Sequence, residues 1–141
     1  MSVTKIMSSE VVTVEMDDEL SVVKEIFDNT HFHHLLVVHS EKLIGVLSDR
    51  DLLKALHPNI GSISETSKDA ALLNKKVHQI MTRKPISLTA DAKIYEAVEL
   101  FNDNKISCIP VVDDENKPAG ILTWRDIMQA LVDNRAKQLK G

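Results

Sequence analysis

The sequence predicts an α/β (α+β) protein made of two β-α-β-β-α repeats that pair around a shared core. The segment Ile6-Met7-Ser8 recurs as Ile80-Met81-Thr82, and the glycine-led segment at 45–51 recurs at 120–126. Between these motifs, hydrophobic residues follow strand and helix periods in the same order twice. A repeat of about 55 to 60 residues is only marginally stable alone, so we expect the two copies to share a core.

The distance between equivalent positions identifies a loop. It is 74 residues from Phe27 to Phe101 but 75 residues from Gly45 to Gly120. The second copy therefore carries one additional residue, which we place in the polar, turn-forming stretch at 113–118. Surface loops tolerate such insertions.

Each copy begins with a strand and a helix. The short extended segments at 11–14 and 86–88 each precede an acid, Asp17 or Asp91, which we expect to be the helix N-cap. Apolar residues then recur at helical spacing. These positions are Leu20, Val23, Ile26 and Phe27 in the first copy and Ile94, Ala97, Val98 and Phe101 in the second.

Two further strands and a second helix complete each copy. The strands are predicted at 35–38 and 43–47 in the first copy and at 109–112 and 119–122 in the second. The first strand of each pair is a continuous apolar run, which is typical of buried strands. Pro110 indicates an edge strand or the start of a strand. The last helix of each copy begins at Ser48 or Thr123.

The repeat positions divide the chain into four parts. These are the first repeat at 1–57, a linker at 58–76, the second repeat at 77–133 and a C-terminal tail at 134–141. The linker begins with Pro58 and Gly61, and we expect a helical turn around 69–73. The tail is expected to be a solvated helix end whose cations suit a helix C-terminus.

Composition narrows the classes of function. The net charge is −4 and no basic stripe occurs, which argues against a nucleic-acid partner. No apolar run approaches membrane-spanning length and no secretory hydrophobic segment is seen, so we expect a cytoplasmic protein without a membrane partner. The single cysteine, Cys108, excludes an internal disulfide framework.

The sequence lacks the common catalytic motifs, so we expect no enzymatic activity and no required cofactor. It has no nucleophile elbow, Walker-type phosphate loop, zinc-protease helix or dinucleotide-binding glycine fingerprint. His31 and His33 share a face of an extended strand, but a metal site needs further ligands at a suitable spacing. Cys108 beside an apolar run is typical of buried packing rather than of a nucleophile.

The Gly-x-x-Ser/Thr-x-x-Asp pattern is the strongest candidate for ligand binding. Ser48 with Asp51, and Thr123 with Asp126, resemble a helix capping box, which is a purely structural explanation. The same helix start also attracts an anion such as phosphate. The aspartate would repel phosphate but would accept hydrogen bonds from a ribose diol. The preceding glycine fits the close approach of a backbone or a ligand, or a strand bulge.

The order of these motifs resembles a tandem pair of cystathionine-β-synthase (CBS) domains. Ile-Met-Ser/Thr, a strand, an Asp, an amphipathic helix and Gly-h-h-Ser/Thr-x-Arg-Asp, where h is hydrophobic, occur twice in register. In the first copy, Ser48-Asp49-Arg50-Asp51-Leu52 is similar to stand-alone bacterial CBS-pair proteins, including those associated with acetoin utilisation. The resemblance covers the chain except for the linker and the tail.

The resemblance implies that the two repeats pair as a pseudo-twofold module. This module would be a non-catalytic regulatory sensor that binds adenosine-containing ligands in two clefts between the repeats. The ligands would be AMP, ADP, ATP or S-adenosylmethionine, and the output would pass to an unknown protein partner in trans. It also implies a homodimer built from the apolar faces of the helices. One cleft would combine Asp126, Thr123 and Arg125 with Ser8, Val12, His33 and His34. The other would combine Asp51, Ser48 and Arg50 with Thr82, Ile86, Ser107 and Cys108.

The two clefts would differ, because His33 and His34 stand where the second copy has Ser107 and Cys108. We expect the Asp126 cleft to take the phosphorylated ligand, with tighter binding at mildly acidic pH, where histidines are protonated. S-adenosylmethionine fits the less basic cleft better. A module that has lost ligand binding and works through its dimer surface is the alternative of a different class, and a hydrolase using His and Asp is a third.

Overall fold

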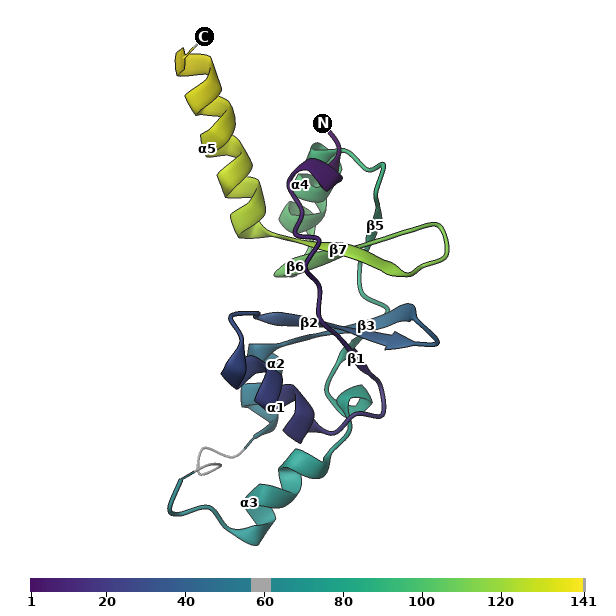
Figure 1. Cartoon of the computed structure of the whole chain (residues 1–141), viewed down its shortest axis with the longest axis vertical. Helices are drawn as coiled ribbons and strands as arrows, with labels where there is room; N and C mark the ends of the chain where they lie inside the picture. The colour runs from purple at the N-terminus through teal and green to yellow at the C-terminus, as the bar shows by residue number, and fades with distance from the viewer. Residues whose placement is uncertain (57–61, 141) are drawn as a thin grey trace. The chain divides into compact units, whose positions relative to one another are not determined.

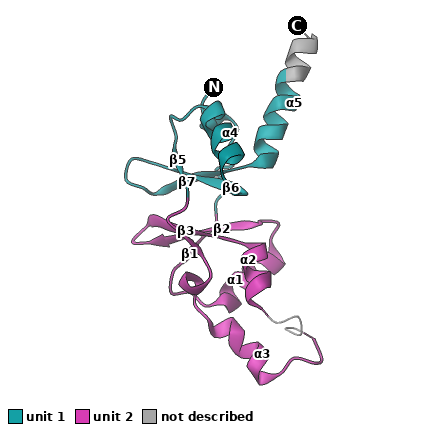
Figure 2. Ribbon diagram, turned by 180° about the vertical axis from the view of Figure 1, so that it is seen from behind, with its two compact units in different colours: residues 1–11, 86–141 teal, residues 12–85 magenta. Residues whose placement is uncertain are grey.

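The computed structural model describes residues 1–56 and 62–140, with side chains up to residue 134. The chain forms two compact units (Figure 2). One consists of residues 12–85, and the other consists of residues 1–11 together with 86–141. We refer to them as the 12–85 unit and the 86–141 unit.

The 12–85 unit contains a sheet with the strand order β1-β2-β3-β4. Its strands are β1 (Thr13–Glu15), β2 (His34–His39), β3 (Lys42–Ser48) and β4 (Thr82–Arg83), and its helices are α1 (Leu20–Asn29), α2 (Asp49–Ala55) and α3 (Ser67–Ala71). Strand β1 is parallel to β2, and the other pairs are antiparallel. Helices α1 and α2 lie on the same side of the sheet (Figure 1).

The 86–141 unit repeats this arrangement. It contains β5 (Leu88–Thr89), α4 (Ile94–Asp103), β6 (Cys108–Val112), β7 (Pro118–Thr123) and α5 (Trp124–Lys140). Strand β5 is parallel to β6, and β6 is antiparallel to β7. Ser8 pairs with Ile121 as Thr82 pairs with Val46 in the other unit. The predicted β-α-β-β-α order is confirmed in both repeats.

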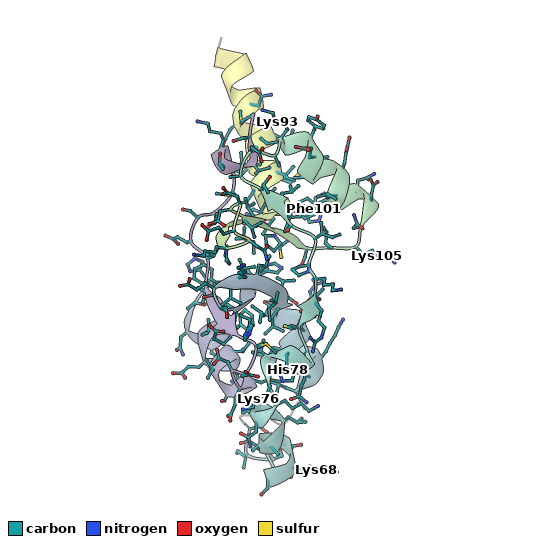
Figure 3. All side chains as sticks on the ribbon, turned by 90° about the vertical axis from the view of Figure 1, so that its right-hand side faces the viewer. Lys68, Lys76, His78, Lys93, Phe101 and Lys105 are labelled. Carbon is teal, nitrogen blue, oxygen red and sulfur yellow. The ribbon has the colours of Figure 1, made fainter. Side chains whose placement is uncertain are left out.

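Each unit has its own buried core. In the 12–85 unit the core consists of Val14, Leu20, Val23, Leu35, Val37, Leu47, Leu52 and Val77. In the 86–141 unit it consists of Val3, Ala92, Ala97, Phe101, Ile109, Val111, Leu122 and Ile127, with Phe101 labelled in Figure 3. Val3 and Val77 are both fully buried. The predicted shared core therefore takes the form of two cores, each completed by a residue from the other repeat.

The two repeats exchange the segments that carry Val3 and Val77. The Val77 N–H donates to the Asp18 carbonyl at 2.8 Å, and the Val3 N–H donates to the Ala92 carbonyl at 2.9 Å. Lys76 and His78, on either side of Val77, are labelled in Figure 3. Lys76 Nζ lies 3.5 Å from Glu19 Oε1, and His78 Nε2 lies 4.0 Å from Asp17 Oδ1. The compact units consequently do not coincide with the repeats at 1–57 and 77–133.

The expected helix caps at Asp17 and Asp91 are wrong. The N-cap positions are Glu19 and Lys93. The residue after Asp17, Asp18, accepts a hydrogen bond from the Glu15 N–H in the turn before α1. Asp91 accepts a hydrogen bond from the Thr89 hydroxyl. The first N–H groups of the helices are satisfied by the exchanged segments: Leu20 donates to the Lys75 carbonyl and Ile94 donates to the Met1 carbonyl. These carbonyls satisfy N–H groups that have no partner within the helix, and in α4 the Glu96 carboxylate also accepts a hydrogen bond from the Lys93 N–H.

The edge or initial position expected for Pro110 is also wrong. Pro110 is the third residue of β6, which lies between β5 and β7. Strand β5 pairs only with Val111 and Val112, so the missing N–H of Pro110 costs no hydrogen bond to β5.

The loops agree with the sequence. The β2–β3 turn has Ser40 and Glu41 at φ of 51° and 67°, and the β6–β7 loop has Asn116 at 62°. The loop at 113–118 is closed by the Asp113 carboxylate, which accepts hydrogen bonds from the N–H groups of Glu115 and Lys117. The helical turn expected in the linker is present as α3, which is followed by a 3-10 turn at Leu72–Asn74. The tail continues α5, as expected.

Candidate functional site

The glycines that precede the candidate sites make room for methionines. A Cβ on Gly45 would lie 2.6 Å from Met81 Sδ and 3.0 Å from the Thr82 carbonyl oxygen. A Cβ on Gly120 would lie 2.5 Å from Met7 Sδ and 2.9 Å from the Ser8 carbonyl oxygen. The glycines are thus required by close approach of another segment, and Met7 and Met81 are packing residues.

Ser48 and Asp51 form a reciprocal capping box at the start of α2. The Ser48 N–H donates to Asp51 Oδ2 at 2.8 Å, and the Asp51 N–H donates to Ser48 Oγ at 3.1 Å. Both residues are half-buried and Arg50 is exposed. The structural explanation of the motif is therefore correct for the first repeat.

Thr123 and Asp126 form a related arrangement at the start of α5. The Thr123 N–H donates to Asp126 Oδ2 at 2.8 Å, and the Thr123 hydroxyl donates to the same oxygen at 3.2 Å. Within the described residues, neither Asp126 Oδ1 nor Asp51 Oδ1 accepts a hydrogen bond. Each half-buried carboxylate keeps one oxygen for a hydroxyl donor of a ligand.

The histidine pair lies beside the first of these sites. His34 is opposite Ser48 in the β2–β3 ladder, and Cys108 is opposite Thr123 in the β6–β7 ladder. The predicted equivalence of His33-His34 and Ser107-Cys108 is therefore confirmed by strand register. His33 Nδ1 lies 2.9 Å from Asp49 Oδ2, an acid that sequence reasoning did not assign to the site.

Acids and burial oppose each other at His34. Burial lowers the pKa of His34 below its ordinary value, and the neighbouring His33 acts in the same direction, whereas Asp49 and Asp51 raise the pKa. Burial therefore favours the neutral form of His34. A positive charge on His34 requires a more acidic solution or a bound anion.

The structure places the predicted site residues in two groups. Ser8, Ile86, Ser107, Cys108, Thr123, Arg125 and Asp126 lie in the 86–141 unit, and Val12, His33, His34, Ser48, Arg50, Asp51 and Thr82 lie in the 12–85 unit. Ser8 adjoins the strand that ends at Thr123, and Thr82 adjoins the strand that ends at Ser48. The combinations of residues from different units stay a prediction.

The second unit has an aromatic pair where the first has an ion pair. Trp124, at the position equivalent to Asp49, packs its ring against Phe101 with centroids 5.1 Å apart. From the sequence, the residue opposite His33 could have been sought by counting outward along both strands from the β2–β3 turn. This count misses Asp49 by one residue, because the register shifts between Val37 and Val38.

The described residues also bear on metal sites and on membrane spans. No group of three or more His, Cys, Asp or Glu side chains is placed to hold a metal ion in that part of the chain. None of the helices in the described ranges has both the length and the apolar character needed to cross a membrane.

Solved structures share this architecture. The CBS domain pair of protein MJ0100, in complex with 5-methylthioadenosine and S-adenosyl-L-methionine, is 25% identical with a TM-score of 0.77, over 95% of this chain and 98% of that one. The cytosolic domain of the Mg²⁺ channel MgtE in complex with ATP is 25% identical with a TM-score of 0.72, over 92% of this chain and 48% of that one. A putative acetoin utilization protein (AcuB) from Vibrio cholerae has the same fold, at 22% identity and a TM-score of 0.79, over 100% and 97% of the two chains.

Comparison of the sequence with known proteins identifies the family. Protein MJ1232 of Methanocaldococcus jannaschii is 32% identical over 86% of this chain, and inosine-5'-monophosphate dehydrogenase of the same archaeon is 31% identical over 89%. The chain spans only 36% and 22% of the lengths of these two relatives. Residues 3–58 and 77–133 each match the CBS domain. Both the fold and the sequence thus show that this chain belongs to the CBS domain family, as a tandem pair.

Proposed function

We propose that this chain is a non-catalytic regulatory module that binds adenosine-containing ligands, AMP, ADP or ATP, and signals to a protein partner in trans. The observation that carries the proposal is the carboxylate of Asp126, with Asp51 as its counterpart. One oxygen of each carboxylate organises the start of a helix, and the other stays open to a ligand hydroxyl. A ribose diol supplies two such hydroxyl donors.

The phosphate is proposed to lie near Thr123 and the start of α5, where helix N–H groups and the helix dipole favour an anion. The complexes of MgtE with ATP and of MJ0100 with adenosyl ligands support this class of ligand. The homodimer implied by the family is part of the same proposal.

S-adenosylmethionine is the second candidate ligand. Asp49 lies against His33, and Asp51 adds a second acid near His34. These acids offset the attraction of the histidine pair for a polyphosphate and suit a sulfonium cation. The choice between the two ligand classes then depends on which unit supplies the contacts beyond the ribose.

The test is a titration with AMP, ATP and S-adenosylmethionine, followed by calorimetry and by the fluorescence of Trp124, the single tryptophan. We expect Asp126→Ala to weaken binding about 10-fold to 100-fold, because hydrogen bonds to a charged group contribute about 1.5–3 kcal/mol. Asp51→Ala should have this effect only if the second site is occupied.

Asp103→Ala, at the exposed end of α4, is the matched control and should leave binding unchanged. A calorimetric null with all three ligands would reject the sensor function and favour the ligand-free interaction module. Equal affinity of the wild-type protein and the Asp126→Ala and Asp51→Ala variants would reject the assigned site.

A further inference from the structure

His33 and Asp49 are joined at two points in the 12–85 unit. The Asp49 N–H donates to the His33 carbonyl at 3.0 Å, and His33 Nδ1 lies 2.9 Å from Asp49 Oδ2. His33 directly precedes β2 and Asp49 is the first residue of α2, so the pair links the start of a strand to the start of a helix. The backbone contact fixes the two residues relative to each other, and the side-chain contact then orients the imidazole.

The Asp49 carboxylate determines which nitrogen of His33 carries the hydrogen. A carboxylate accepts hydrogen bonds and donates none, so the hydrogen in this contact lies on Nδ1. In a neutral imidazole the other nitrogen, Nε2, is then a hydrogen-bond acceptor. The side chain of His33 is 74% exposed, so a ligand can reach the ring. Nε2 therefore suits a ligand group that donates a hydrogen bond, whereas a phosphate oxygen needs a donor.

The charges around the histidine pair also disfavour a phosphate chain. Burial lowers the pKa of His34 and favours its neutral form, so this second imidazole adds little positive charge. Asp49 and Asp51 both act on His34 in the opposite direction, which shows that two acids lie close to it. Acids at this distance repel an anion and attract a cation.

The second repeat has neither half of this pair. Ser107 and Trp124 stand at the positions of His33 and Asp49, and the Trp124 ring packs on Phe101. The helix dipole alone would favour an acid in the first turn of α2, which is a purely structural explanation of Asp49. A purely structural acid affects stability but not the choice between ligands, so the two explanations can be separated by measurement.

We propose that Asp49 positions His33 with Nε2 as an acceptor, so that the histidine pair selects an adenosyl ligand with a cationic or hydrogen-bond donor group and discriminates against a phosphate chain. The inference rests on the proposed function and narrows its ligand class at these histidines. S-adenosylmethionine carries an ammonium and a sulfonium group and has this chemistry, and ATP is the opposite case.

Calorimetry with S-adenosylmethionine and ATP at pH 8, where ordinary imidazoles are neutral, gives the ratio of the two dissociation constants. Asp49→Ala should shift this ratio toward ATP about 10-fold, the usual scale for one hydrogen bond to a charged group. Asp49→Glu keeps the carboxylate and should restore most of the wild-type preference. Glu25→Gln removes an exposed acid from α1 in the same unit and is the matched control, which should leave the ratio unchanged.

The His33→Ala background tests whether Asp49 acts through the imidazole. In this background Asp49→Ala should shift the ratio clearly less than it does in the wild type. Equal shifts in the two backgrounds, or an unchanged ratio in Asp49→Ala, would overturn the proposed role of the pair. A calorimetric null with both ligands in the wild type and in every variant is a different result, because it would reject the proposed function itself.

NMR of the imidazole nitrogens follows the pair without an adenosyl ligand. In the wild type the spectra should show the hydrogen of His33 on Nδ1, and inorganic triphosphate should leave the His33 signals unchanged. In Asp49→Ala the hydrogen should move toward Nε2, and triphosphate should then shift these signals. A wild-type His33 with its hydrogen on Nε2, or an equal response of both proteins to triphosphate, would overturn the inference.

Discussion

Gly45 and Gly120 lie where segments of the two repeats approach each other, and neither position has room for a Cβ. Each faces a methionine sulfur and a backbone carbonyl of the segment exchanged with the other repeat. The sulfur belongs to a flexible side chain and can move, whereas the carbonyl of Ser8 is held by the Ile121 N–H at 2.9 Å. A side chain larger than hydrogen therefore conflicts with a strand pairing rather than only with a side chain.

We predict that Gly120→Ala destabilises the protein by about 1–3 kcal/mol, the usual range for overpacking in a core. Gly45→Ala should behave similarly, since its Cβ would meet Met81 and the Thr82 carbonyl. Urea unfolding measures the free energy. Lys42→Ala, at the exposed start of β3, is the control and should change the free energy by less than about 0.5 kcal/mol.

Adding Met7→Ala to Gly120→Ala removes the sulfur but not the Ser8 carbonyl. Any recovery of stability should therefore be incomplete. Full recovery in the double variant would show that the backbone approach at Gly120 is not limiting.

His34 provides a second prediction at the residue scale. Its folded pKa is lowered, mainly by burial, so the unfolded chain takes up a proton on this imidazole first as the pH falls below 6.5. Linkage then requires that the contribution of His34 to stability is fully present above pH 6.5 and declines below it.

Urea unfolding at pH 5 to 8 should show a smaller loss of stability at acidic pH in His34→Gln than in the wild type. The exposed His31, in His31→Gln, serves as the control and should follow the wild-type curve. A wild-type acidic loss that His34→Gln retains in full would contradict the assignment.

Among the helices and strands, some features depend on the local sequence and others depend on pairing with distant segments. Period and capping residues predicted the strands, the helices and the N-cap of α2 at Ser48, because these depend on neighbours along the chain. The starts of α1 and α4 were misassigned, because their N–H groups are satisfied by residues distant in sequence. The β2–β3 ladder changes register between Val37 and Val38. No local sequence pattern predicted this irregularity.

Exchange of the segments at Val3 and Val77 leads to a prediction at the element scale. Each valine is fully buried in the core that is built mainly by the other repeat. Val3→Ala should cost about 1–3 kcal/mol, from lost transfer free energy and a small cavity. In the Val3→Ala variant we expect faster amide hydrogen exchange in β6 and β7, although Val3 belongs to the first repeat in sequence.

Val77→Ala is the matched variant and should accelerate exchange in β2 and β3 instead. Mass spectrometry resolves the two regions in one experiment. Acceleration confined to the same repeat as each substitution would contradict the exchange of segments.

At the scale of the whole molecule, the exchange of segments couples the stability of the two units. If residues 12–85 unfolded, they would become a long flexible loop between residues 1–11 and residues 86–141, which belong to the same unit. Closing such a loop costs roughly 4 kcal/mol, so each unit favours the folded state of the other.

The sequence by itself determined the duplication, the order of elements, the family resemblance and the acids at 51 and 126, because each is expressed in residue types at short, regular spacing. Only the tertiary structure decided which repeat receives each Ile-Met motif, why the glycines precede the sites, and that Asp49 lies against His33. These are pairings between segments far apart in the chain or shifted by a bulge. Their free energy comes from packing and hydrogen bonds formed on folding, which no local pattern encodes.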